Sequence, residues 1–85
     1  MKKIKIIGIN VLDRIKASNQ VQSALSEFAS LIETRLGFHE LTPEISSRKA
    51  FIILKLKGNS EKWEKFEHRL GEIRGIEVKT MDFRY

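Results

Sequence analysis

The stretch Ala-Phe-Ile-Ile-Leu-Lys-Leu-Lys at residues 50–57 decides the fold of this protein. It is short, rich in β-branched and aromatic side chains, and followed by the turn residues Gly58 and Asn59, which predicts a β-strand. Because alternate residues of a strand share a face, this strand is apolar on both faces. Both of its faces therefore need cover.

A helix and a last strand are expected after this segment. Apolar residues return at steps of three and four while charged residues fill the positions between them, which is typical of an amphipathic helix. These apolar residues are Trp63, Phe66, Leu70 and Ile73. The helix is expected to stop at Gly75. Beyond it, Ile76, Val78 and Thr80 alternate with charged residues and predict a strand with one wet face.

A strand and a longer helix are expected before residues 50–57. Residues 3–12 are rich in isoleucine and valine and predict the first strand. The spacing of the next apolar residues predicts a helix that begins at about residue 14 or 18, capped by Asp13 or Ser18, and ends at Leu36, followed by Gly37. The stripe consists of Val21, Leu25, Phe28, Ile32 and Leu36. Residues 38–42 then predict a short edge strand, and a loop containing Pro43 follows.

The order of strands and helices predicts an α+β fold, a ferredoxin-like β-α-β-β-α-β sandwich. Its four-stranded antiparallel sheet would carry two helices on one face, with strands 3–12 and 50–57 in the centre. With a length of 85 residues, the chain fits one domain, residues 1–85.

Composition excludes several kinds of chemistry. The chain has no cysteine, which removes disulfides, thiolate nucleophiles and cysteine-ligated metals. It has no phosphate-binding glycine loop, no zinc-protease motif and no nucleophile elbow, so we expect neither an enzyme nor a bound cofactor. The apolar run at residues 4–12 is too short and too polar for export or for a membrane span, so we expect a cytoplasmic protein without a membrane partner.

The face of the sheet that the helices leave open should be polar, yet both central strands are apolar on both faces. Leaving several large apolar side chains in water would forfeit roughly 1.5–3 kcal/mol for each. The chain has no spare segment to cover them. We therefore expect a second copy on this face or at a sheet edge, in a homodimer or a tetramer.

Positive charge is concentrated at one end of the predicted sheet. The chain carries a net charge of +5, and Lys3, Lys5, Lys55 and Lys57 would lie near one another in antiparallel neighbours. These lysines are either solubilising residues that flank hydrophobic strands or an anion-binding or nucleic-acid patch. The second interpretation makes a basic nucleic-acid-binding regulator the alternative function.

The two histidines define no metal site. His39 could ligate a metal across a subunit interface or serve as a polar interface residue, and His68 lies among charged helix residues. We assign no metal ligand to either.

Several segments resemble one family. Val-Leu-Asp-Arg at residues 11–14, Arg-Leu-Gly-Phe at 35–38, the strand at 50–57 and, most specifically, Leu-Gly-Glu-Ile-Arg-Gly-Ile-Glu-Val-Lys-Thr at 70–80 are similar to the iron-only hydrogenase system regulators. These are small ACT-like proteins, themselves similar to the ligand-sensing domain of nickel-responsive regulators.

The resemblance implies an ACT-like domain, an oligomer and a role in transcriptional regulation linked to the hydrogenase system. ACT-like domains commonly bind a small effector between the first strand-helix loop and a partner subunit, which here implies a ligand site at Asn10, Asp13, Arg14 and Lys16. Asp13 has an equally good role as the helix cap. Such a module would act through a DNA-binding or maturation partner protein. Nickel sensing is not implied, because the chain has two histidines and no cysteine.

Overall fold

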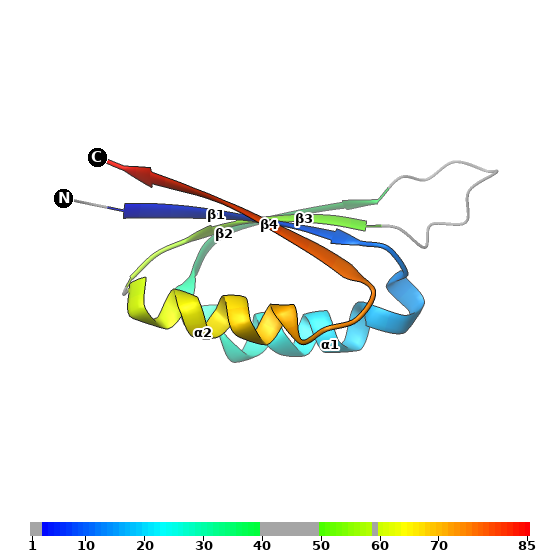
Figure 1. Ribbon diagram of the computed structural model, residues 1–85. Coiled ribbons are helices and arrows are strands. Elements are labelled where there is room, and N and C mark those ends of the chain that lie inside the picture. Colours follow the sequence, from blue (N-terminus) through cyan, green and yellow to red (C-terminus); the bar gives the residue numbers. More distant parts are fainter. Residues whose placement is uncertain (1–2, 40–49, 59) are drawn as a thin grey trace.

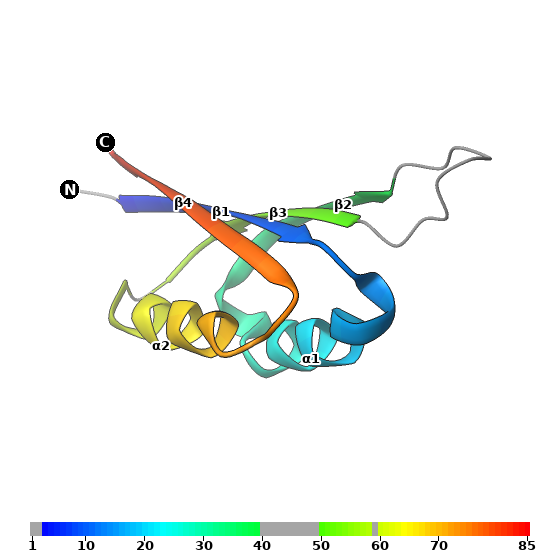
Figure 2. The same cartoon turned by 45° about the vertical axis from the view of Figure 1, so that its right-hand side comes forward.

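The computed structural model describes residues 3–39, 50–58 and 60–85. Its strands and helices follow one another as β1 (Lys3–Val11), α1 (Arg14–Glu27), the short 3₁₀ helix η1 (Ala29–Leu31), β2 (Ile32–His39), β3 (Ala50–Leu56), α2 (Ser60–Gly71) and β4 (Ile76–Arg84). The strands form one layer, and both helices pack on the same face of it (Figures 1 and 2). This confirms the predicted α+β, ferredoxin-like β-α-β-β-α-β fold.

The sheet is antiparallel and has the order β2-β3-β1-β4. The two most apolar strands, β1 and β3, lie in the centre as predicted, and Ile7 of β1 lies opposite Leu54 of β3. Directly opposed residues share a face, so this register assigns every strand residue to either the helix-covered face or the open face.

The helix-covered face holds the core. Its central side chains are completely buried, including Ile7, Ile9 and Leu54 of the sheet and Phe66 of α2. Phe66 also packs against Phe28, with 5.0 Å between the ring centroids. The other core residues are Val11, Ala17, Val21, Ala24, Leu25, Leu31, Ala50, Ile52, Leu56, Trp63, Leu70 and Ile73.

The prediction that the first helix continues to Leu36 was wrong. The α-helix ends at Glu27, and Ile32 and Leu36 both belong to β2, as does Gly37. The reason is that a four-residue step suits an undistorted strand as well as a helix, so this spacing could not distinguish the two. In β2, the bulge after Ile32 places Ile32 on the helix-covered face and Leu36 on the open face. The β-branched residues Ile32 and Thr34 favour the strand. The edge strand predicted at 38–42 therefore begins six residues earlier than expected.

Asp13 begins α1. Its carboxylate accepts a hydrogen bond from the backbone N–H of Lys16 at 3.4 Å, and its carbonyl accepts one from Ala17 at 3.0 Å. This is the arrangement of an N-cap residue, and it selects Asp13 over Ser18, which lies inside the helix.

The second helix is shorter than predicted and the last strand is longer. Helix α2 ends at Gly71, while Gly75, with a φ of 86°, lies in the turn before β4. A positive φ is unfavourable for any residue with a Cβ, which explains glycine at this turn. Strand β4 then continues past Thr80 to Arg84. Part of the predicted edge strand (40–42), the loop at Pro43 and the turn residue Asn59 lie outside the described residues.

Candidate functional site

The open face of the sheet carries a patch of exposed apolar side chains from β2, β3 and β4. The strand register places Leu36 opposite Ile53, and it places Met81 and Phe83 opposite Ile6 and Ile4 of β1. The large side chains that stay exposed are Leu36 (58%), Phe51 (46%), Ile53 (39%), Met81 (56%) and Phe83 (51%). We call these five residues the open-face patch. They are the side chains that the predicted cover must shelter.

Charged groups beside this patch balance one another. Lys55 of β3 forms an ion pair with Glu33 of β2 at 3.2 Å. On the other side of the face, Glu77 and Lys79 of β4 lie opposite Asn10 and Gly8 of β1. The charges of these two lysines and two glutamates sum to zero, although the whole chain carries a net charge of +5.

The predicted effector residues gather at one end of the sheet. Asn10 lies near the end of β1, between Phe51 and Glu77 in the register, and its amide donates to the Glu77 carboxylate at 3.4 Å. Asp13 caps α1, and Lys16 is exposed in the first turn of that helix. Arg14 is the first residue of α1. Of the four residues, only Asn10 borders the open-face patch, because the other three lie at the start of α1 in the helix layer. Their shared role in ligand binding stays a prediction.

The four predicted basic residues lie at the opposite end of the sheet, but they do not form one surface. Lys5 lies on the helix-covered side, since its neighbours in the register are Leu56 and Asp82, whereas Lys55 lies on the open face. Lys3 and Lys57 are exposed. Three of the four, all except Lys5, line a hollow in the surface.

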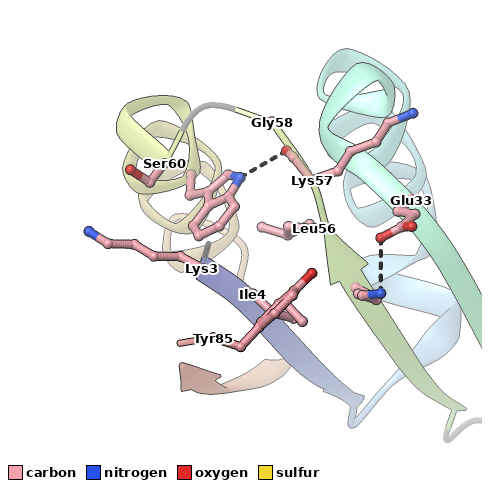
Figure 3. A pocket seen from close by; sticks show the side chains of 10 residues that line it. Lys3, Ile4, Glu33, Leu56, Lys57, Gly58, Ser60 and Tyr85 are labelled. Carbon is pink, nitrogen blue, oxygen red and sulfur yellow. Dashed lines mark hydrogen bonds and ion pairs between the residues drawn. The ribbon is translucent and has the colours of Figure 1, made fainter. Parts of the chain in front are cut away.

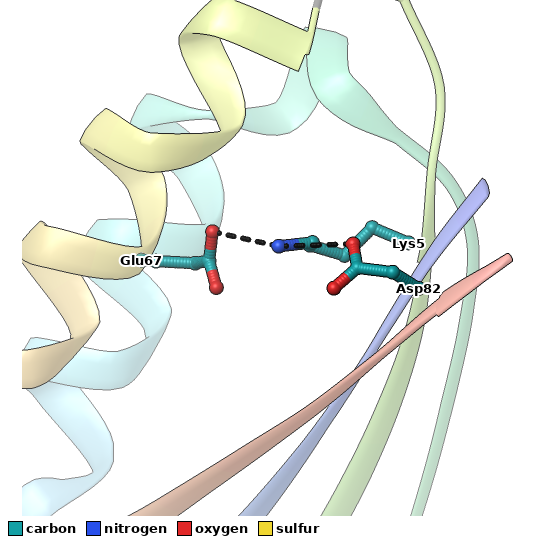
Figure 4. A network of polar contacts seen from close by, with 3 residues as sticks. All are labelled: Lys5, Glu67 and Asp82. Atoms are coloured by element: carbon teal, nitrogen blue, oxygen red, sulfur yellow. Dashed lines mark hydrogen bonds and ion pairs between the residues drawn. The ribbon is translucent and has the colours of Figure 1, made fainter. Parts of the chain in front are cut away.

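Lys5 is held by two carboxylates (Figure 4). Its ammonium lies 3.0 Å from Glu67 of α2 and 3.2 Å from Asp82 of β4, and its side chain is only 13% exposed. Burial alone would lower the pKa of Lys5, but the hydrogen bonds and negative charges of Glu67 and Asp82 outweigh it and raise the pKa above its ordinary value of 10.5. Lys5 therefore ties α2 and β4 to β1 and is not available to an external anion.

The hollow lies where β1 begins, β3 ends and α2 begins, with a volume of about 490 Å³ (Figure 3). Its apolar wall comes from Ile4, Leu56, Trp63 and Tyr85. Trp63 is 3% exposed, and its indole N–H donates to the Lys57 carbonyl at 3.0 Å, which fastens α2 to the end of β3. The polar part of the lining comes from Lys3, Glu33, Lys55, Lys57 and Ser60, with Gly58 completing the rim.

Within the described ranges, no three histidine, cysteine, aspartate or glutamate residues come together in a way that could hold a metal ion. His39 is the last residue of β2, and His68 is exposed on α2. None of the helices in the described part of the chain is long and apolar enough to span a bilayer.

Sequence reasoning missed the end of β4. Met81 and Phe83 of the open-face patch, Asp82 beside Lys5, and Tyr85 of the hollow all follow Thr80, where the last strand was expected to stop. The alternation of Met81, Asp82 and Phe83 continues the strand pattern and could have revealed this extension. Nothing in the residue spacing could have paired Glu67 with Lys5, because that contact depends on how α2 crosses the sheet.

The fold and these surfaces define a small, single-sheet α+β protein with a ferredoxin-like sandwich and a bare apolar face. The particular family follows from a family model, described as "TM1266-like: Iron-only hydrogenase system regulator, putative", which matches residues 3–80. The chain belongs to this family. This confirms the resemblance seen in residues 70–80 and the other matching segments.

Solved structures agree. This chain is similar to the uncharacterized protein TM1266 from Thermotoga maritima, with 33% identity, a TM-score of 0.80, and 98% of this chain and 100% of that one covered. No curated protein matches the sequence.

More distant structures share only the fold. One is a formyltetrahydrofolate deformylase from Pseudomonas putida KT2440, with 11% identity, a TM-score of 0.57, and 92% of this chain and 28% of that one covered. Another is SnoaB, a cofactor-independent oxygenase from Streptomyces nogalater, with 6% identity, a TM-score of 0.59, and 100% of this chain and 94% of that one covered.

Proposed function

We propose that this protein is a non-enzymatic, self-associating ACT-like regulatory module of the iron-only hydrogenase system. It binds a small effector at the interface between copies and acts in transcriptional regulation through a DNA-binding or maturation partner protein. The observation that carries the proposal is the open-face patch, because an apolar surface of this kind needs a partner. Family membership supplies the regulatory context.

A second copy of this chain is the partner that we favour for the open face. The apolar centre suits any hydrophobic partner, but the charges beside it select among them. The lysines at 55 and 79 are balanced by the glutamates at 33 and 77, so two identical faces can meet in a two-fold arrangement without net repulsion. A nucleic acid would need an excess of positive charge on this face.

The size of the patch suits reversible association. Each of its five side chains is about half exposed, and burying the remainder contributes about 1 kcal/mol for each. Two copies supply ten such side chains, on the order of 10 kcal/mol. That sum is comparable with the roughly 4–15 kcal/mol that association costs, so we expect the dimer to respond to single substitutions.

The effector site follows from this arrangement. Asn10 lies beside Phe51 at the edge of the patch, and the loop that leads to Asp13, Arg14 and Lys16 begins directly after β1. A second copy on the open face would cover Asn10, and a pocket there would extend around the end of β1 to this loop. An amino acid or another small polar molecule is the expected ligand class.

Size-exclusion chromatography with light scattering tests self-association. We expect a dimer or tetramer at micromolar concentration, and we expect Phe51→Lys to shift it to a monomer, because a charge buried within the interface would lack a partner. Ala29→Lys is the matched control, since Ala29 is an exposed apolar residue of η1 in the helix layer. A wild-type protein that is monomeric under these conditions contradicts the proposal.

A thermal-shift screen of amino acids, nucleotides and divalent metals tests the effector site, because a ligand that binds only the folded protein raises its stability. A hit that is lost in Lys16→Gln supports the loop. A mobility shift with DNA that weakens steeply with salt would instead support the basic alternative, with Lys3, Lys55 and Lys57 as its accessible lysines.

A further inference from the structure

The hollow at the other end of the sheet has the dimensions of a small-molecule site. Its volume of about 490 Å³ lies within the range of roughly 300–1,000 Å³ that ligand pockets occupy. It is built from all four strand segments at this end of the sheet and from α2, within one copy of the chain: Glu33 comes from β2, and Tyr85 directly follows β4. It therefore exists whether or not the protein self-associates.

The wall of the hollow is apolar and aromatic. Leu56 and Trp63 close its inner side and are almost fully buried, whereas Tyr85 is 67% exposed at the mouth. The indole N–H of Trp63 is already bonded to the Lys57 carbonyl, so the tryptophan offers only ring surface to a ligand. Ile4 also lines the hollow and adds to this apolar surface. A small planar group would therefore contact chiefly Ile4 and Tyr85, with Leu56 and Trp63 forming the floor beneath it.

The rim of the hollow is positively charged. Three lysines and one glutamate line it, and the glutamate, Glu33, is paired with Lys55 at 3.2 Å. The ammonium groups of Lys3 and Lys57 have no carboxylate partner among the described residues. Figure 3 shows the two side chains on opposite sides of the hollow, with both ammonium groups directed outward. Because lysine has a long, flexible stem, either ammonium can turn toward a negative group at the mouth.

We propose that this hollow binds a small organic anion. Its planar, apolar body would lie against Ile4, Leu56, Trp63 and Tyr85, and its carboxylate or phosphate would be held by Lys3 and Lys57. The site is separate from the effector loop of the proposed function, which lies at the opposite end of β1.

Trp63 provides a direct readout, because it is the single tryptophan of the chain and lines the hollow. We would titrate the full chain with benzoate, with its neutral isostere benzamide, with phenyl phosphate and with inorganic phosphate. Benzoate or phenyl phosphate should change the tryptophan fluorescence saturably, with a dissociation constant of about 1 mM for ligands of this size. Benzamide and inorganic phosphate should each bind more weakly, because one lacks the charge and the other lacks the apolar body.

The two anions distinguish the source of the charge. Tighter binding of phenyl phosphate would assign the site to phosphate-bearing ligands, and tighter binding of benzoate would assign it to carboxylates. Equal binding of benzamide and benzoate would overturn the role of the lysines. Absence of saturation by either anion at about ten times the expected dissociation constant, together with an unchanged melting temperature, would overturn the site.

Variants separate this proposal from the proposed function. Lys3→Gln and Lys57→Gln should each weaken binding about fivefold, the effect of one close charge in a solvated setting. Lys65→Gln is the matched control, because Lys65 is an exposed lysine of α2 outside the hollow. Phe51→Lys and Lys16→Gln should leave this binding unchanged, since they alter the open face and the effector loop. Loss of anion binding in those two variants, with binding intact in Lys3→Gln and Lys57→Gln, would contradict the location.

Discussion

The two faces of the sheet differ in what their apolar residues do. Along β3, Ile52, Leu54 and Leu56 are at most 6% exposed under the helices, whereas their immediate neighbours Phe51 and Ile53 are 46% and 39% exposed on the other side. The side chains are of the same kind, and a step of one residue separates the two environments. We infer that apolar residues on the covered face stabilise the single chain, whereas those on the open face serve association.

The largest effect should come from adjacent substitutions on β3. Leu54→Ala removes a completely buried side chain and leaves a cavity, so it should lower the free energy of unfolding by about 3–4 kcal/mol. Ile53→Ala should cost less than about 1 kcal/mol in the dilute monomer, because its side chain already contacts water. Urea denaturation at two protein concentrations measures both effects.

The dependence on protein concentration separates the two variants further. In the proposed assembly, Ile53→Ala should destabilise the protein more at high protein concentration than at low concentration, because association is linked to folding. Equal losses for Leu54→Ala and Ile53→Ala at every concentration would show that the two faces do not differ as we infer.

A smaller effect is expected at the helix cap, where the two proposed roles of Asp13 can be separated. Asp13→Ala should lower the stability of α1, and thus of the covered face, by about 1 kcal/mol, because the Lys16 N–H loses its acceptor. Asp13→Asn should retain most of this stability, since asparagine is an equally good cap. The melting temperature of each variant measures the contribution of the cap, and the ligand-induced thermal shift measures the role of Asp13 in effector binding. An Asn variant that is as unstable as the Ala variant would contradict the capping role.

The smallest effect is expected at Lys5, at the border of the covered face. Its Glu67 and Asp82 partners are partly exposed, so Lys5→Met should cost about 0.5 kcal/mol at neutral pH. The folded-state pKa of Lys5 is raised, so this contribution is fully present below pH 10.5 and is lost as the pH rises through the higher folded pKa. The stability difference between wild type and Lys5→Met should therefore shrink above pH 10.5.

Asp82→Asn is the companion variant for Lys5. The Asp82 side chain is 65% exposed, more than twice the exposure of Glu67. Asp82→Asn should therefore lower the free energy of unfolding by less than Lys5→Met does. A stability difference that grows with pH above 10.5 would mean that the ion pairs do not stabilise the folded chain.

Most of the fold could be predicted from the sequence, for a physical reason. The strand at 50–57 and the amphipathic helix around Phe66 have unambiguous periods, and they identified the central strands and the side that the helices cover. The prediction for residues 28–36 was wrong because a four-residue spacing suits a helix and an undistorted strand alike, and the bulge in β2 leaves no trace in that spacing. There, only the β-branched residues and the turn around Ala29 distinguish the two.

The candidate sites were less predictable than the fold. Neighbouring strands brought Lys3, Lys55 and Lys57 to one end of the sheet as expected, but the strand pleat turned Lys5 to the helix side. The hollow depends on Trp63 and Tyr85, which are far apart in sequence and meet only in the folded chain. The ligand role of Asn10, Asp13, Arg14 and Lys16 stays a prediction.

The two outer strands also limit how this protein can assemble. Strand β4 carries charges at Glu77, Lys79, Asp82 and Arg84, and the pairing of β2 with β3 is irregular between Ile32 and Thr34. Charged and bulged borders discourage unlimited strand addition from chain to chain. In the proposed assembly, a two-fold contact through the open face would close on itself after two copies. Such a molecule can expose an apolar surface for self-association and still avoid polymerising into filaments.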